Sequence, residues 1–270
     1  MKTPRIAAVV ALSLAPLAAA ALPAHAASDA TVSILHAVPG ATVDVYANGK
    51  ALLTNFKPGT LTDPLMLPAG TYDLKVTAAG AGASGKAIIQ ANGVQVPGGA
   101  NVTVVAHLDA SGKPELTPYV NDTSMVPAGK ARLTVRHDAA APAVDVRAGG
   151  TPVFKNLTNP NQAMGLVGAG TVKADVVLAG TSKVAIGPAD LTLKEGTNTI
   201  VYAWGSAKDN NLKLAVQTIG GMHSAPGGIP AGGGQAQGSS DLGRYAAVGG
   251  AGALAAAAVL VTRRRAVPTR

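Results

Sequence analysis

The chain has 270 residues and no cysteine, so it has room for one large or two small domains but cannot use disulfides, thiolate metal ligands or a cysteine nucleophile. A bacterial lipoprotein is excluded for the same reason, since its lipid is attached to a cysteine. The formal charge of +8 lies mostly at the two ends, because residues 28–220 carry 15 Lys and Arg against 13 Asp and Glu. No basic stripe remains to follow a phosphate backbone, so we expect no nucleic-acid partner.

Residues 1–27 have the pattern of a secretory signal peptide. "MKTPR" supplies two positive charges, an apolar run extends from Ile6 to Leu22, and "AHA" at 24–26 offers the small residues that a signal peptidase needs. We therefore expect an exported protein whose mature chain begins near Ala27 or Ser28.

The next two hundred residues, roughly, have the pattern of short β-strands. Runs such as "TVSILHAV", "TVDVYA", "TYDLKVTA" and "NVTVVAHL" are rich in β-branched residues, and Gly, Pro, Asn and Asp separate them. No stretch has a sustained helical period. The pattern predicts an all-β chain of the sandwich or barrel type.

This strand pattern occurs twice in the sequence, as an internal repeat. "HAVPGATVDVYANG" at 36–49 returns as "HDAAAPAVDVRAGG" at 137–150, and "LPAGTYDLKVTAAG" at 67–80 returns as "VGAGTVKADVVLAG" at 167–180. "GANVTVVAH" at 99–107 likewise returns as "GTNTIVYAW" at 196–204. We assign residues 28–122 and 128–219 to two tandem β-sandwich domains. Because the linker is short and polar, we expect each domain to fold by itself.

The last fifty residues, roughly, predict a stalk and an anchor. Residues 220–244 are dense in Gly, Pro, Ser and Gln, which is typical of a flexible stalk. Residues 245–262 carry no charge and are long enough for a transmembrane helix, and the arginines of the 263–270 tail favour a cytoplasmic position for it. We expect a single-pass membrane protein with its N-terminal region outside the cell. Two alternatives stay open: a buried Ala-rich helix, and a sortase substrate, although "IPAGG" at 229–233 lacks the Thr of the cleavage motif.

The segments "VSILHAVPGATVDVYANGK", "LPAGTYDLKV" and "GANVTVVAHL" together resemble the bacterial domain-of-unknown-function family 4397. The second copy is similar but more divergent, because it lacks the Tyr after Val-Asp-Val and the Leu-Pro before the Ala-Gly-Thr turn. The resemblance implies an immunoglobulin-like β domain at the cell surface, and it implies no activity.

The repeated His and Asp residues are the first candidates for chemistry. His36 ends a strand pattern just before a Pro-Gly turn, and Asp44 lies on the next strand, where we expect it to point outward or towards an edge. A catalytic pair would need a nucleophile beside the His, and none recurs with it. We therefore interpret His36 with Asp44, and His137 with Asp145, as structural turn pairs that bind loop amides or each other.

Metal, cofactor and sugar sites have weaker support. No His cluster recurs, so we expect no metal. "GAGASGKA" at 80–87 fits a Gly-rich phosphate loop, but Ala87 stands where Ser or Thr is required and a strand follows, so we expect no nucleotide cofactor. The only two glutamates, Glu115 and Glu195, do not form a glycosidase pair. Among the aromatic residues, Trp204 is the candidate ligand contact.

These patterns predict a non-catalytic, surface-anchored protein of the bacterial cell envelope. It would serve in binding, adhesion or structure, with an unknown envelope or extracellular ligand as its partner. The alternatives are an envelope enzyme acting on glycans or peptides, and a protein attached to the cell wall by a sortase.

Overall fold

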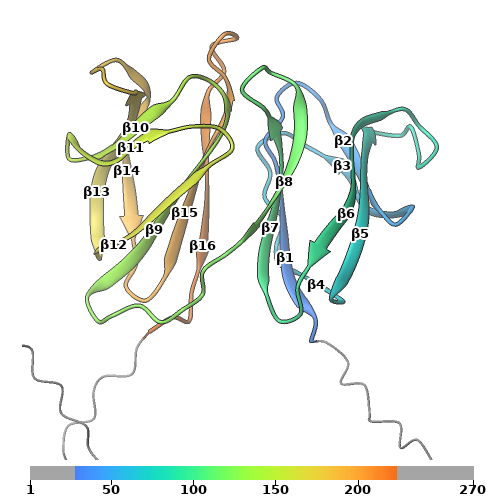
Figure 1. Cartoon of the computed structure of the whole chain (residues 1–270), viewed down its shortest axis with the longest axis horizontal. Coiled ribbons are helices and arrows are strands. Elements are labelled where there is room, and N and C mark those ends of the chain that lie inside the picture. Colours follow the sequence, from blue (N-terminus) through green and yellow to red (C-terminus); the bar gives the residue numbers. More distant parts are fainter. Residues whose placement is uncertain (1–27, 224–270) are drawn as a thin grey trace, which may run out of the picture. The chain divides into compact units, whose positions relative to one another are not determined.

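The computed structural model describes residues 28–223, and every regular element in that part is a β-strand (Figure 1). The prediction of an all-β chain is confirmed. The signal peptide, the stalk from residue 224 onward, the transmembrane helix and the cytoplasmic tail lie outside the described residues. Within 28–223, no helix has the length and apolar character that spanning a membrane requires.

The first eight strands form two four-stranded sheets that pack face to face. One sheet has the order β4-β1-β7-β8, with β4 at Leu65–Leu67, β1 at Ala30–His36, β7 at Asn101–Leu108 and β8 at Pro114–Val120. The other has the order β3-β2-β5-β6, with β3 at Lys50–Phe56, β2 at Val43–Ala47, β5 at Gly70–Ala78 and β6 at Ala87–Val96. Within the first sheet, β1 and β7 run parallel, whereas the other pairs are antiparallel.

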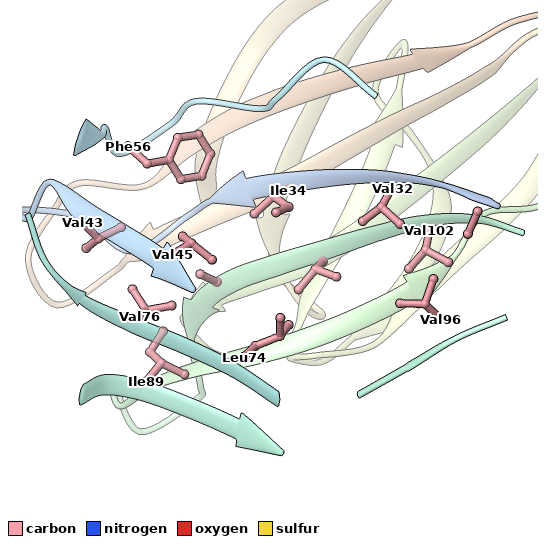
Figure 2. Packing of buried hydrophobic residues seen from close by; sticks show 13 residues of the cluster. Val32, Ile34, Val43, Val45, Phe56, Leu74, Val76, Ile89, Val96 and Val102 are labelled. Carbon is pink, nitrogen blue, oxygen red and sulfur yellow. The ribbon is translucent and has the colours of Figure 1, made fainter. Parts of the chain in front are cut away.

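Alternate residues of both sheets point into a shared core. Val32 and Ile34 of β1 face Val45 of β2 and Val76 of β5, as Figure 2 shows. This is the period-two burial that a pleated strand imposes, and it accounts for the alternation in the sequence.

The second eight strands repeat this topology strand by strand. One sheet has the order β12-β9-β15-β16, with β12 at Gln162–Gly168, β9 at Lys130–Ala140, β15 at Asn198–Ser206 and β16 at Lys213–Ile219. The other has the order β11-β10-β13-β14, with β11 at Thr151–Leu157, β10 at Val144–Ala148, β13 at Gly170–Leu178 and β14 at Val184–Leu193. The parallel pair recurs between β9 and β15.

The two sandwiches also share a third buried cluster, which we call the junction. Leu35, Val105 and Tyr119 of the first sandwich pack there with Tyr202 and Trp204 of the second. These side chains lie on the faces of β1, β7, β8 and β15 that point away from the two cores, so the central strands are buried on both faces. Contacts beyond the linker therefore join the two sandwiches, because β7 packs against β9 and β15.

The linker between the two sandwiches is bound to the second sandwich by hydrogen bonds and an ion pair. The Arg132 guanidinium donates to the Ser124 backbone oxygen at 3.0 Å and to the Ser124 hydroxyl at 2.8 Å. It also lies 3.2 Å from the Asp122 carboxylate. Val126 forms a parallel bridge with His223, so the linker lies beside the end of the described chain.

Candidate functional site

Each repeated His binds the backbone of its own turn. The His36 Nε2–H donates to the Ala41 carbonyl oxygen at 2.8 Å, and Nδ1 accepts from the Val38 N–H at 3.4 Å. The second sandwich repeats both bonds, at 3.0 and 3.4 Å, with His137, Pro142 and Ala139. One donor and one acceptor nitrogen define a neutral imidazole.

Burial keeps both rings in that neutral form. It lowers the pKa of His36, although the hydrogen bond to Ala41 opposes the change, and it lowers the pKa of His137 in the same way. Because both ring nitrogens already have backbone partners, neither His is free to act as a general base.

Each repeated Asp joins two chain segments. The Asp44 carboxylate accepts from the backbone N–H of Asn55 and of Gly80, both at 2.8 Å. The second sandwich makes the same two bonds, at 2.7 and 3.0 Å, with Asp145, Asn156 and Gly180. Asn55 has φ of 53° and Asn156 has φ of 52°, a left-handed conformation that Asn tolerates better than most residues.

The structure therefore does not bring His36 and Asp44 together through a hydrogen bond, since each has its own backbone partners. It also places Asp44 inside, at 4 % exposure, where the sequence pattern suggests an outward position. A carboxylate that binds two backbone N–H groups can be buried without an unsatisfied charge, which the strand alternation does not reveal.

A second group of polar side chains lies in the junction, where sequence reasoning did not mark a site. Arg136 is fully buried, and its guanidinium donates to Gln162 at 3.0 Å, to the Tyr202 hydroxyl at 2.8 Å and to Asn121 at 2.7 Å. It also lies 4.1 Å from the centre of the Tyr119 ring. Neutral acceptors and an aromatic face thus hold the charge in place.

Asp138 lies beside this arginine and is buried. The Tyr119 hydroxyl is 2.7 Å from Asp138 Oδ1 and 2.8 Å from the Pro160 carbonyl oxygen, although a phenol has one hydrogen to donate. The hydroxyl can therefore donate to one of them at a time, and both contacts form together only when Asp138 carries a proton and donates it to Tyr119. Burial raises the pKa of Asp138, while His107, a hydrogen bond donated by Tyr119 and Arg136 oppose the change.

Further bonds across the junction join the two sandwiches directly. The Thr103 hydroxyl donates to Gln217 at 2.9 Å, and the Asn159 amide donates to the Leu108 carbonyl oxygen at 2.7 Å. These contacts hold the sandwiches together, and Thr103, Arg136 and Asp138 are buried between them.

Trp204, the candidate ligand contact, also lies in the junction. It is 4 % exposed and packs with Tyr202. A Cβ at Gly59 of the first sandwich would lie 3.0 Å from the ring, so the close approach depends on glycine there. The ring offers no exposed face for stacking a sugar.

An open cleft of about 210 Å³ lies between the two sheets of the second sandwich, along the edge formed by β14 and β16. Val172, Ala174, Leu191, Leu214 and Val216 are among its apolar lining residues. Leu214 and Val216 face the interior beside Ala203 and Val201, yet they are 36 % and 49 % exposed, because that edge stands open.

Two ion pairs form the polar rim of the cleft. Arg147 binds the Asp175 carboxylate in a bidentate manner at 2.7 and 2.6 Å, and Lys173 lies 3.2 Å from Asp190. Each charge at the rim thus has an opposite partner, so the cleft favours an uncharged group.

The matching part of the first sandwich, beside Leu74 and Leu116, holds only a small cavity of about 20 Å³. The signal for this difference lies in the repeat itself. In the paired segments 67–80 and 167–180, Tyr72 and Leu74 correspond to Val172 and Ala174, which are smaller. Comparing the two copies position by position would have found the cleft.

Within residues 28–223, no group of three or more His, Asp or Glu side chains gathers.

Comparison with known proteins adds one finding. No curated protein matches the chain. A family model matches once, from residue 30 to residue 147, so it covers the first sandwich and continues through β9 and most of β10. The match thus includes Tyr119 and Arg136 of the junction, and a second copy of the family remains a prediction from the repeat. The matching model describes a domain of unknown function, DUF4397, and it is to this family that residues 30–147 are similar.

Proposed function

We propose that this chain is a non-catalytic binding protein displayed on the bacterial cell envelope. A signal peptide at 1–27 exports it, a flexible stalk at 220–244 holds it away from the membrane, and the segment 245–262 anchors it. The two sandwiches, which we assign to the immunoglobulin-like class, form the displayed part.

One observation carries the proposal: the repeated His and Asp side chains, which are the first candidates for catalysis, form hydrogen bonds to the backbone of turns and loops. His36 and Asp44 bind only backbone groups of their own sandwich, and both bonding patterns return in the second. A catalytic His needs a free nitrogen and a nearby nucleophile, whereas a folding device must recur in each sandwich.

The junction supports a role in display. Because the two sandwiches share buried apolar and polar contacts, they would act as one body at the end of the stalk. Such a body can present a fixed surface to a ligand without a conformational step.

Protease added to intact cells that express the full chain tests the location. We expect the bulk of the protein to be removed and a small membrane-bound fragment to remain. Mass spectrometry of the C-terminus then separates a membrane anchor, which keeps the tail to Arg270, from a sortase product, which ends earlier. Full protection of the chain in intact cells would contradict surface display.

Incubation of the purified full chain with isolated cell-wall glycan and peptide fractions tests the chemistry. We expect no new fragments by mass spectrometry, either from the wild type or from the variant His36→Gln with His137→Gln. Fragments that the wild type releases and the variant does not would support the envelope-enzyme alternative instead.

A further inference from the structure

The open cleft of the second sandwich indicates what kind of ligand the protein takes, and this inference rests on the proposed binding function. The two sandwiches have the same strand order, so one serves as an internal reference for the other. In the first, β6 packs against β8 along the edge, whereas β14 and β16 make at most marginal contact.

The first sandwich also shows which groups fill this space. The ring of Tyr72 packs against the core while its hydroxyl donates to the Pro68 carbonyl oxygen at 2.7 Å, and Leu74 is buried beside it. Val172 and Ala174 leave this space unfilled in the second sandwich. An apolar cavity of about 150 Å³ is known to accept a benzene ring, so a cleft of 210 Å³ has room for an aromatic side chain.

The strand beside the cleft has a free edge. Within residues 28–223, β16 is the last strand of its sheet and pairs with β15 alone. Its counterpart β8 carries Pro118 opposite Val104, and Val216 of β16 stands opposite the matching Val201. Proline is tolerated in an edge strand only where its missing N–H would face away from the sheet. The N–H of Val216 therefore points to the free edge, where an added strand can bind it.

We propose that the cleft and the free edge of β16 together bind an extended segment of a partner protein that carries an aromatic side chain. The segment pairs with β16 as an added strand, and its ring enters the space that Tyr72 fills in the first sandwich. Main-chain bonds then supply affinity and the cleft supplies selectivity for the ring.

The sequence of the chain argues against other occupants. Residues 224–244 contain no aromatic residue, so the segment that follows the described part has no ring to insert. A second copy offers none either, because the aromatic side chains within 28–223 are engaged in their own copy. Tyr46 is buried, and the others pack in the three apolar clusters: Phe56, Tyr72, Tyr119, Phe154, Tyr202 and Trp204. Tyr245 is the one aromatic residue of the sequence outside 28–223, and it begins the segment that we assign to the membrane anchor. The proposal therefore takes the ring from another protein.

The test uses the full chain in a lipid nanodisc, because detergent could enter the cleft. The probes are the peptide acetyl-Thr-Val-Xaa-Val-Thr-amide with Tyr, Phe, Trp or Ala at the centre, followed by fluorescence anisotropy, and toluene and octanoate, followed by methyl NMR. We expect the best aromatic peptide to bind at least about tenfold more tightly than the Ala peptide, which corresponds to about 1.4 kcal/mol. Toluene should shift the methyl signals of Leu214 and Val216, and octanoate should not.

Three variants separate the two parts of the site. Val172→Tyr and Ala174→Leu copy the first sandwich and should weaken both peptide and toluene binding at least about tenfold, a loss equivalent to about 1.4 kcal/mol. Val216→Pro copies Pro118 and should abolish peptide binding while toluene still binds. Val184→Ala, which removes an exposed apolar group outside the cleft, is the matched control and should change neither.

Several outcomes would overturn the inference. They are no binding by toluene and by every peptide, a preference for octanoate, unchanged peptide binding in folded Val172→Tyr and Ala174→Leu, or unchanged peptide binding in Val216→Pro. Melting curves establish whether each variant is folded. If Val172→Tyr does not fold, the binding measured with Ala174→Leu tests the cleft in its place. Failure here leaves surface display and the lack of turnover intact, whereas failure of the proposed function would appear in the protease and mass-spectrometry tests.

Discussion

Replacing Asp44 by alanine should lower the melting temperature of the protein by far more than the same change at Asp145. The Asp44 carboxylate is buried and accepts from the N–H groups of Asn55 and Gly80, both at 2.8 Å. A hydrogen bond to a charged group contributes about 1.5–3 kcal/mol. Loss of the pair, after partial relaxation and entry of water, should cost about 2–4 kcal/mol.

The described part of the chain falls in the size range where 1 kcal/mol shifts the melting temperature by roughly 2–4 °C, so Asp44→Ala should melt about 4–16 °C lower. Asp145 makes the same two bonds, but it is partly exposed, so water can replace the carboxylate and the shift should be clearly smaller. Asp44→Asn should also be destabilised, because one amide N–H would then oppose a backbone N–H.

Thermal melts followed by circular dichroism measure all three variants. An unchanged melting temperature in Asp44→Ala, or an equal or larger shift in Asp145→Ala, would refute the reasoning. The first result would mean that the two backbone bonds contribute nothing net. The second would mean that burial does not set their contribution.

Three further predictions concern the junction. Each sandwich expressed alone should melt well below the intact protein or aggregate, because it exposes the junction cluster; equal melting by calorimetry would show that the junction contributes nothing. Because burial raises the folded-state pKa of Asp138, its contribution to stability is present below the ordinary value of 3.8 and is lost as the pH rises through the raised value. Asp138→Asn, whose amide can donate to Tyr119 as a protonated carboxyl would, should therefore gain stability over the wild type as the pH rises from 4 to 8 in urea titrations, and a constant difference would contradict a raised pKa of Asp138. Gly59→Ala, which pushes on Trp204, should cost more than Gly40→Ala, which has a similar positive φ but open space, and equal melting shifts would show that the ring yields freely.

The local structure could be predicted from the sequence because its causes are local. Runs of Val, Ile and Thr between turn residues predict strands, and the repeated His and Asp predict devices that bind turn amides. The structure has strands there and places His36 and Asp44 at turn amides. The aligned copies also differ at Tyr72 and Val172. This difference could have predicted the cleft, although the sequence analysis did not use it.

The burial of the junction could not be predicted from the sequence. Strand residues alternate between two faces in the same way, whether the second face meets water or another sandwich. Arg136 and Asp138 alternate with inward residues just as solvent-exposed side chains do, and only the packing of β9 against β7 buries them. The cleft depends on packing for the same reason, since small residues leave a space only where no other strand closes the edge. By itself the sequence determined the strands, their turns and their repetition, through local backbone preference and period-two alternation. Only the tertiary structure decided which second faces meet each other and which face water, because that choice depends on contacts between residues far apart in the chain.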